Sequence, residues 1–189
     1  MKIILGLGNP GEKYSFNRHN FGFYVAERFR MEHDFPEFKF DKKFRAEISI
    51  AEVSDEKVAV VRPQTFMNLS GEAARAVLDF FKILPADVLV VFDDVDLDFG
   101  TIRFRHDGGS GGHNGVKNLI THLGTQNFPR LKLGVRNEFL RAQIPTEKFV
   151  LSDFSAEEKK ELSVIEKRAS DSIAEFLIHG LEAAMTRFN

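Results

Sequence analysis

Short apolar runs alternate with amphipathic segments along most of this 189-residue chain. The runs 3–5 and 88–92 are uninterrupted and apolar, which is typical of strands buried on both faces of a sheet. Between them, Phe21, Val25 and Phe29 recur every four residues, a spacing that places all three on one face of a helix. The pattern therefore predicts a strand, then a glycine-rich turn, then a helix that begins close to Asn20.

Further elements follow from the same pattern and from local start and stop signals. Two strand-like runs, 45–53 and 57–61, flank a polar turn and predict a β-hairpin. The remaining predictions are a helix from Gly71, a strand over 101–105, a helix over 117–122, a strand over 130–135, a mobile polar loop over 137–148, and a helix that opens with the capping box Ser155–Glu158 and closes at Gly180. Strands that alternate with helices, plus one hairpin, predict an α/β fold: one domain over residues 1–189, with a twisted mixed sheet flanked by helices.

Composition narrows the class of protein. Hydrophobic residues make up 43% of the chain and charged residues 29%, as in a globular domain, and cysteine is absent. Without an apolar run of membrane-spanning length or the layout of a signal peptide, we expect a protein of the cytoplasm that does not enter a membrane. The formal net charge is -2, yet residues 101–145 carry seven basic side chains against two acidic ones. Such a patch suits a partner with a few defined phosphates, or is an ordinary charged face.

The glycine-rich stretch 6–11 also matches the dinucleotide-binding pattern G-x-G-x-x-G. Three features argue against a nucleotide site. Pro10 removes a backbone N–H donor, the predicted helix begins well after Gly11, and the segment 31–39 is charged and irregular where a second strand ending in an acid is required.

Several side chains near predicted strand ends could carry acid–base chemistry. His19 is the first candidate general base, and a carboxylate from Asp93, Asp94 or Asp96 could hold its second ring nitrogen. The alternative for His19 is a purely structural hydrogen bond. The amides of Asn9, Asn68 and Asn114 could donate to a developing oxyanion, or could serve turns and caps, and His113 could be a second base or a turn residue.

A rival nucleophile is Ser110, because residues 108–112 match G-x-S-x-G between a predicted strand and a predicted helix. Asp153 and His179 follow in the order of the α/β-hydrolases. Against this, the loop from Arg105 to Ser110 is too long for a sharp turn, and His179 lies near a helix end where a solvated histidine is ordinary. The six histidines show no metal-ligand spacing, so no metal site is expected.

Four motifs follow one another along the chain: Gly-Leu-Gly-Asn-Pro-Gly over 6–11 with Tyr14 and Arg18-His19-Asn20, then 65–71, then 93–97, then 108–115. Taken together and in this order, they resemble the bacterial peptidyl-tRNA hydrolase family. The strand 130–135 and the segment 149–154 also look like the family's.

The resemblance implies an esterase that releases a peptide from tRNA, works as a monomer in the cytoplasm, and uses no cofactor or metal. In the family pattern His19 is the general base, Asp93 orients it, and Asn9 with Asn68 holds the last peptide carbonyl and the attacking water. Asn114 positions the water or the substrate, while Tyr14, Phe66 and Met67 line the cleft for the 3′ end. Arg105 and Lys132 match the basic pair that clamps the 5′ phosphate of the tRNA.

This sequence departs from the family pattern in places. Lys132 stands where arginine is common, which keeps the charge and loses bidentate phosphate binding. The segment 136–148, which the resemblance implies would form part of a movable cover over the cleft, differs from the family's usual loop. A tRNA-binding protein of the same fold without catalysis is the alternative from another class, and the retained candidate catalytic residues argue against it.

Overall fold

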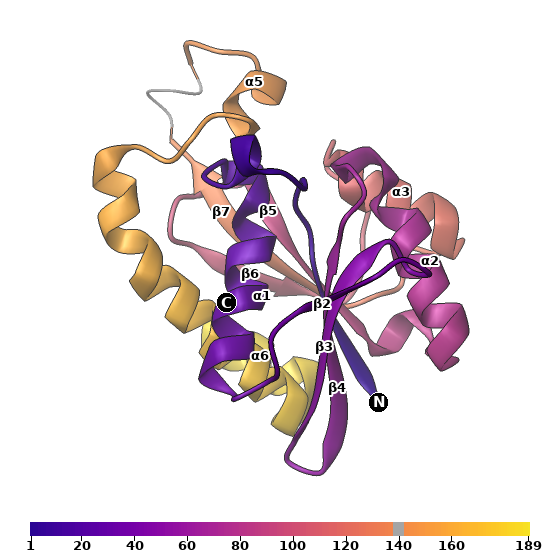
Figure 1. Cartoon of the computed structure of the whole chain (residues 1–189). Helices are drawn as coiled ribbons and strands as arrows, with labels where there is room; N and C mark the ends of the chain where they lie inside the picture. The colour runs from indigo at the N-terminus through magenta and orange to yellow at the C-terminus, as the bar shows by residue number, and fades with distance from the viewer. Residues whose placement is uncertain (138–141) are drawn as a thin grey trace.

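The computed structural model describes residues 1–137 and 142–189, and it contains seven strands in one sheet. Figure 1 shows the strands viewed close to edge-on, with helices on either side. The strands are β1 Lys2–Gly6, β2 Lys39–Asp41, β3 Ala46–Val53, β4 Glu56–Pro63, β5 Val88–Asp98, β6 Ile102–Arg105 and β7 Arg130–Arg136. The helices are α1 Phe21–Glu32, α2 Ser70–Phe81, α3 Asn114–Leu123, α5 Thr146–Val150 and α6 Ala156–Phe188.

The sheet is mixed and has the order β2-β3-β4-β1-β5-β7-β6. Its centre is parallel, since β1 pairs with β4 and β5, and β5 pairs with β7 in the same direction. The hairpin partner β3 and the edge strands β2 and β6 run antiparallel to their neighbours. The α/β prediction with a mixed sheet is therefore confirmed. The segments that follow β1 and β4, and the end of β5, meet at one edge of the sheet, where open α/β folds build their sites.

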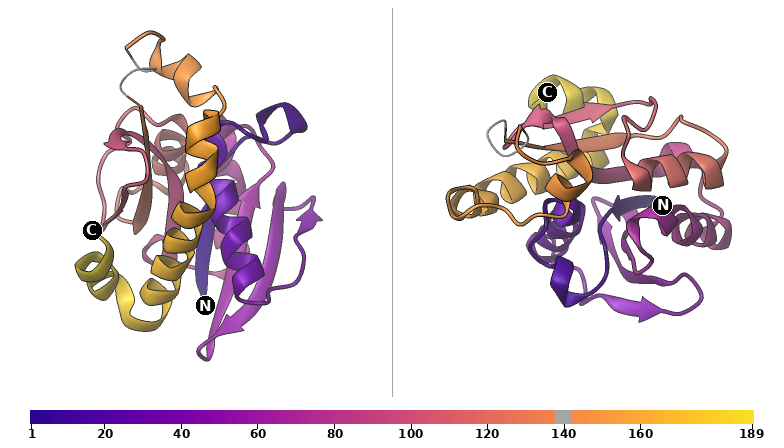
Figure 2. Two further views of the ribbon diagram at one scale, coloured as in Figure 1. Left: turned by 90° about the vertical axis from the view of Figure 1, so that its left-hand side faces the viewer. Right: turned by 90° about the horizontal axis from the view of Figure 1, so that it is seen from above.

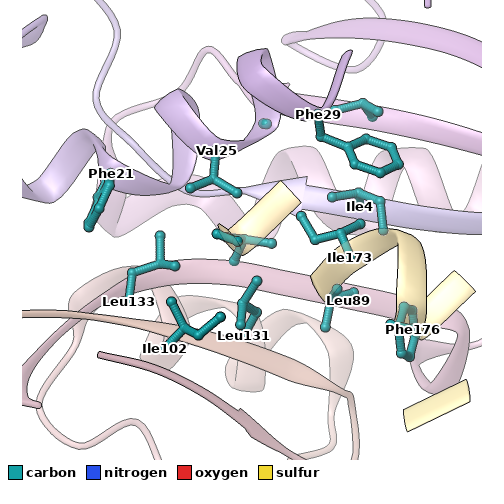
Figure 3. Close-up of a cluster of buried hydrophobic side chains, with 14 of the residues drawn as sticks. Ile4, Phe21, Val25, Phe29, Leu89, Ile102, Leu131, Leu133, Ile173 and Phe176 are labelled. Carbon is teal, nitrogen blue, oxygen red and sulfur yellow. The ribbon is translucent and has the colours of Figure 1, made fainter. Parts of the chain in front are cut away.

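Two hydrophobic cores cover the two faces of the sheet. Alternate residues of a strand point to opposite faces, so Ile4 packs into one core while Ile3 and Leu5 pack into the other. Helices α1 and α6 close the first core, and α2 and α3 close the second (Figure 1). Figure 3 shows the first core, where Phe21, Val25 and Phe29 of α1 face the sheet as their four-residue spacing predicts.

Close backbone approach fixes where α1 begins. A Cβ atom on Gly22 would lie 2.4 Å from the carbonyl oxygen of Val91 and 2.6 Å from the backbone nitrogen of Leu7. A Cβ atom on Gly6 would in turn lie 2.5 Å from the carbonyl oxygen of Gly22. Only glycine permits this packing of α1 against β1 and β5. The contact places His19, just before α1, beside the end of β5.

The structure corrects the ends of two elements and adds one strand. β5 does not end at Phe92: it continues to Asp98 with a register shift against β7 after Asp94, because backbone pairing continues where the side chains turn polar. The short edge strand β2 was not expected, and all three of its residues are exposed. In α6 the backbone is non-helical at Gly180, as the predicted stop requires, but the helix resumes and continues to Phe188.

Other expectations are met or lie partly outside the described chain. The capping box is present, with the Ser155 hydroxyl accepting from the N–H of Glu158 and the Glu158 carboxylate accepting from the N–H of Ser155. The predicted polar loop over 137–148 includes residues 138–141, which lie outside the described residues, and its last part begins the short helix α5. Figure 2 shows α5 standing at the same end of the molecule as the turns that follow β1 and β4.

Among the described helices, none is long and apolar enough to cross a bilayer.

Candidate active site

A cleft of about 510 Å³ opens at the carboxyl edge of the central strands. Its lining comes from the turns after β1 and β4, the end of β5, the glycine-rich loop before α3, and α5. The lining residues are Asn9, Tyr14, His19, Phe66, Met67, Asn68, Phe92, Asp93, Asp94, Val95, 110–114, Thr146, Glu147, Val150 and Leu151. Eight of the ten residues singled out from the sequence thus line one cavity, while Arg105 and Lys132 lie outside it.

Asp93 is the central anion of the cleft. Nδ1 of His19 lies 2.9 Å from Oδ1 and 3.0 Å from Oδ2 of this carboxylate, which is 2% exposed. Of the three acids left open by the sequence, Asp93 is therefore the partner of His19. Burial by itself would raise the pKa of Asp93, but the two imidazoles that contact it outweigh burial and hold that pKa well below its usual range.

His113 is the second imidazole on this carboxylate, with Nε2 3.1 Å from Oδ1 of Asp93. Nδ1 of His113 accepts a hydrogen bond from the N–H of Val116 at 3.2 Å, which caps α3. Because a backbone N–H can only donate, Nδ1 is unprotonated and the proton of the neutral ring lies on Nε2. Burial lowers the pKa of His113, which favours this neutral form. The sequence left His113 as either a base or a turn residue, and it proves to be both a cap and a partner of Asp93.

The two histidines present different atoms to the cleft. The proton that His19 shares with Asp93 lies on Nδ1, so the neutral ring has its lone pair on Nε2. Since His19 lines the cavity, this lone pair is available to take a proton from a molecule bound there. The ring centroids of His19 and His113 lie 4.8 Å apart.

Asn9 is fixed from two directions. The Asn20 side chain pairs with its backbone, accepting from the N–H of Asn9 at 2.8 Å and donating to its carbonyl at 3.0 Å. The Asn9 side-chain oxygen accepts from the N–H of Met67 at 2.8 Å. Since the oxygen is used in this way, the NH₂ group of Asn9 is left to donate into the cleft. Asn20 therefore positions Asn9. In the sequence, Asn20 stands out only as part of the Arg18-His19-Asn20 motif.

The rest of the candidate set lies around this cluster at the mouth of the cleft. Asn68 and Asn114 are exposed, one in the turn after β4 and the other at the first position of α3. The rings of Tyr14 and Phe66 pack edge to face with centroids 6.4 Å apart, and Phe66 is 53% exposed. Val150 and Leu151, at the end of α5, also line the cleft. The mouth therefore combines aromatic surface with free carboxamides.

Several cations lie on one face of the strands β6 and β7. Lys132 is opposite Arg103 in the register, and Arg105 is opposite Arg130, so all four residues face the same side of the sheet. Arg130 is buried and donates to the carbonyl oxygens of Gly108, Gly109 and Gln126, which anchors the glycine-rich loop. Arg105 is exposed, and Nζ of Lys132 lies 2.7 Å from Oδ2 of Asp94.

A buried ion pair lies next to the turn that carries His19. Arg18 is fully buried, lies between the rings of Phe149 and Phe154, and donates to the Glu158 carboxylate at 2.6 Å. A second bond at 2.6 Å reaches the carbonyl oxygen of Asp153. Arg18 directly precedes His19, so this pair ties the turn that carries the histidine to the start of α6. No local pattern indicated this pair, because the partners are 140 residues apart.

Two alternative sites find little support in the geometry. Ser110 lines the cleft, but α3 starts only at Asn114, His179 is exposed on α6, and Asp153 accepts from the side chain of Asn17. As potential metal ligands, His19, Asp93 and His113 bring their ligand atoms within 4.8 Å of one another. Both imidazole nitrogens already face the carboxylate at hydrogen-bonding distance, so a cation would have to displace two protons.

Comparison with known proteins assigns the family. The family model described as peptidyl-tRNA hydrolase matches residues 3–189. The chain is 44% identical to a peptidyl-tRNA hydrolase of Exiguobacterium sibiricum, covering all of both chains, and 41% identical to one of Brevibacillus brevis, covering 100% of this chain and 98% of the relative.

A solved structure of peptidyl-tRNA hydrolase from Acinetobacter baumannii superposes with a TM-score of 0.90 at 29% identity, covering 100% of this chain and 94% of the other. Sequence and structure thus agree along the whole length. The chain belongs to the peptidyl-tRNA hydrolase family, a family of hydrolases that act on an ester bond.

Proposed function

We propose that this enzyme hydrolyses the ester between the C-terminus of a peptide, or an N-blocked aminoacyl group, and the 3′ ribose of tRNA, with His19 as the general base. The observation that carries the proposal is the hydrogen bond of His19 Nδ1 to the buried Asp93, which leaves Nε2 as the basic atom in the cleft. Family membership supports the ester substrate.

The reaction needs one base and a site for the oxyanion. Nε2 of His19 takes a proton from water as the oxygen attacks the ester carbonyl, and Asp93 stabilises the imidazolium that forms. The NH₂ group of Asn9 donates to the developing oxyanion. When the tetrahedral intermediate collapses, the imidazolium returns its proton to the departing ribose oxygen. The products are a free carboxyl group and a tRNA with a free 3′ hydroxyl.

The remaining candidates are assigned to binding. Asn68 holds the last peptide carbonyl or the attacking water together with Asn9, and Asn114 positions the water or the substrate. Tyr14, Phe66 and Met67 receive the 3′ end of the tRNA, where exposed aromatic rings can stack on bases. Amides that recognise peptide backbone explain how one cleft could accept many peptide sequences.

Arg105 and Lys132 are proposed to bind the 5′ phosphate of the tRNA. The two residues share one face of neighbouring strands, and Lys132 reaches Asp94 of the cleft, which supports this role. We further propose that the enzyme works as a monomer in the cytoplasm without a cofactor or metal, since ester hydrolysis needs only the His–Asp pair and positioned amides.

The test is hydrolysis of an N-blocked aminoacyl-tRNA by the wild type, His19→Ala and Ser110→Ala. We expect turnover by the wild type, a loss of about 10²- to 10⁴-fold in kcat for His19→Ala, and near-normal activity for Ser110→Ala. Equal rates for the wild type and His19→Ala would reject the base. Binding without any turnover by the wild type would favour a tRNA-binding protein, and an inactive, folded Ser110→Ala would favour the serine nucleophile.

A further inference from the structure

Asp94 follows Asp93 on β5, and its carboxylate pairs with Lys132 and not with His19. Adjacent residues of a strand point to opposite faces of the sheet, so Asp94 lies on the opposite face from Asp93. This is the face that carries Phe92, and β7 is the neighbouring strand. There Lys132 is the register partner of Phe92, which brings its ammonium to Asp94. The two side chains form an ion pair of 2.7 Å and are 11% and 27% exposed.

The Asp94 carboxylate is held on both oxygens. Oδ1 accepts from the N–H of Asp96 at 2.8 Å, and Oδ2 accepts from the Lys132 ammonium. The carboxylate is therefore anchored by its own strand, while the lysine, on a flexible stem, is the partner that can move. Asp94 also lines the catalytic cleft, so the ion pair lies between the cleft and the basic face of β6 and β7.

We propose that Asp94 is the counter-ion that sets the affinity of the phosphate site: it competes with the 5′ phosphate of tRNA for the Lys132 ammonium. The inference rests on the proposed phosphate-binding role of Lys132. A phosphate monoester that approaches Arg105 and Lys132 must share the ammonium with Asp94 or draw it away, and part of the attraction is lost in either case. Asp94 thereby weakens the hold on the tRNA product and favours its release.

The experiment measures dissociation constants of one deacylated tRNA, prepared with a 5′ phosphate or with a 5′ hydroxyl, at fixed salt. The proteins are the wild type, Asp94→Asn, Lys132→Met and the double variant. The matched control is Asp98→Asn, which removes the same charge from the same strand but alters an ion pair of Arg136 and leaves that of Lys132 in place. Asparagine is nearly isosteric with aspartate and can still accept from the N–H of Asp96, and circular dichroism checks the fold of each variant.

We expect Asp94→Asn to bind the 5′-phosphorylated tRNA about two- to fivefold more tightly than the wild type does. The 5′-hydroxyl tRNA should show no gain. In the Lys132→Met background the Asp94 substitution should have no further effect, and Asp98→Asn should resemble the wild type.

Several outcomes overturn the inference. These are no gain, an equal gain for both tRNAs, an equal gain in Asp98→Asn, or a gain that persists without Lys132. A wild type that binds both tRNAs equally would remove the phosphate role of Lys132 and this inference with it. Ester hydrolysis dependent on His19 would remain intact in that case, so the two failures are distinguishable.

Discussion

The side-chain oxygen of Asn9 accepts a hydrogen bond from the backbone N–H of Met67 at 2.8 Å, which ties the turn after β1 to the turn after β4. The two residues are 58 positions apart in the chain and adjacent at the cleft. Because the oxygen is committed to Met67, the orientation of the Asn9 amide is settled by a donor that cannot accept. The NH₂ group is thereby left as the donor that this side chain can offer to the cleft.

Asn9→Asp tests this orientation. Aspartate keeps an oxygen for Met67 but presents a second, negative oxygen where the NH₂ group donated. Losing a donor to the oxyanion and gaining a charge should lower kcat/KM by about 10²- to 10³-fold. Steady-state hydrolysis of an N-blocked aminoacyl-tRNA measures the effect, with Asn127→Asp at an exposed position as the control. Near-normal activity of Asn9→Asp would show that Asn9 does not donate in the reaction.

Asp93→Asn should separate positioning from charge. The asparagine can accept from His19, but it cannot stabilise the imidazolium, and its NH₂ group can force the wrong tautomer on either ring. We expect a loss of about 10²- to 10⁴-fold in kcat. The pKa of Asp93 is lowered, so its carboxylate stays ionised across the neutral range, and the loss should persist from about pH 7 to 9. A pH–rate profile checks this, and a loss that disappears within that range would contradict it.

His113 should make the stability of the protein depend on pH. Burial lowers its folded-state pKa below the unfolded value, which is about 6.5. Between these two values the unfolded chain binds a proton that the folded chain does not, so the free energy of unfolding falls as the pH drops below about 6.5. The slope is at most about 1.4 kcal/mol per pH unit.

Urea denaturation at several pH values measures this slope. His113→Gln keeps a side-chain donor for Asp93 but does not titrate, so its unfolding free energy should change less between about pH 7 and 5. His179→Gln, at an exposed position of α6, serves as the control and should follow the wild type. The same slope for His113→Gln and the wild type would assign the pH dependence to other groups.

Removing Glu158 should destabilise the fold strongly. Glu158→Ala leaves Arg18 charged and fully buried without its carboxylate partner, and it also removes an acceptor for the N–H of Ser155. Removing one partner of a buried ion pair lowers the free energy of unfolding by about 3–5 kcal/mol. Equilibrium urea denaturation measures the change, and Glu157→Ala, one position earlier and fully exposed, should have little effect. A small change for Glu158→Ala would mean that solvent reaches Arg18.

Arg105→Ala should weaken binding of substrates that carry a 5′ phosphate. Losing one exposed cation at a phosphate costs about 1 kcal/mol, so KM should rise roughly fivefold for phosphorylated tRNA substrates. Hydrolysis of a short ester without RNA should not change. Arg75→Ala, on the exposed side of α2, is the control for net charge. A uniform loss on both substrates would contradict a role in phosphate binding.

Local pattern was enough to predict most of the elements. The apolar run 3–5, the spacing of Phe21, Val25 and Phe29, and the capping box at Ser155 each depend on neighbours within a few positions, and each is present as expected. The end of β5 was missed because its pairing with β7 continues through polar residues. The strand β2 was missed because all its side chains are exposed and leave no apolar signal.

Patterns along the chain predict the α/β arrangement, the set of candidate residues and, through the order of the motifs, the family. The folded arrangement was needed to show which acid holds His19, which way the Asn9 amide points, and that Lys132 pairs with Asp94. Each of these contacts joins residues 38 to 74 positions apart. They depend on the order of the strands and on which face of the sheet each side chain occupies. Local periodicity predicts how side chains alternate along one strand, but it does not predict which strands lie next to each other.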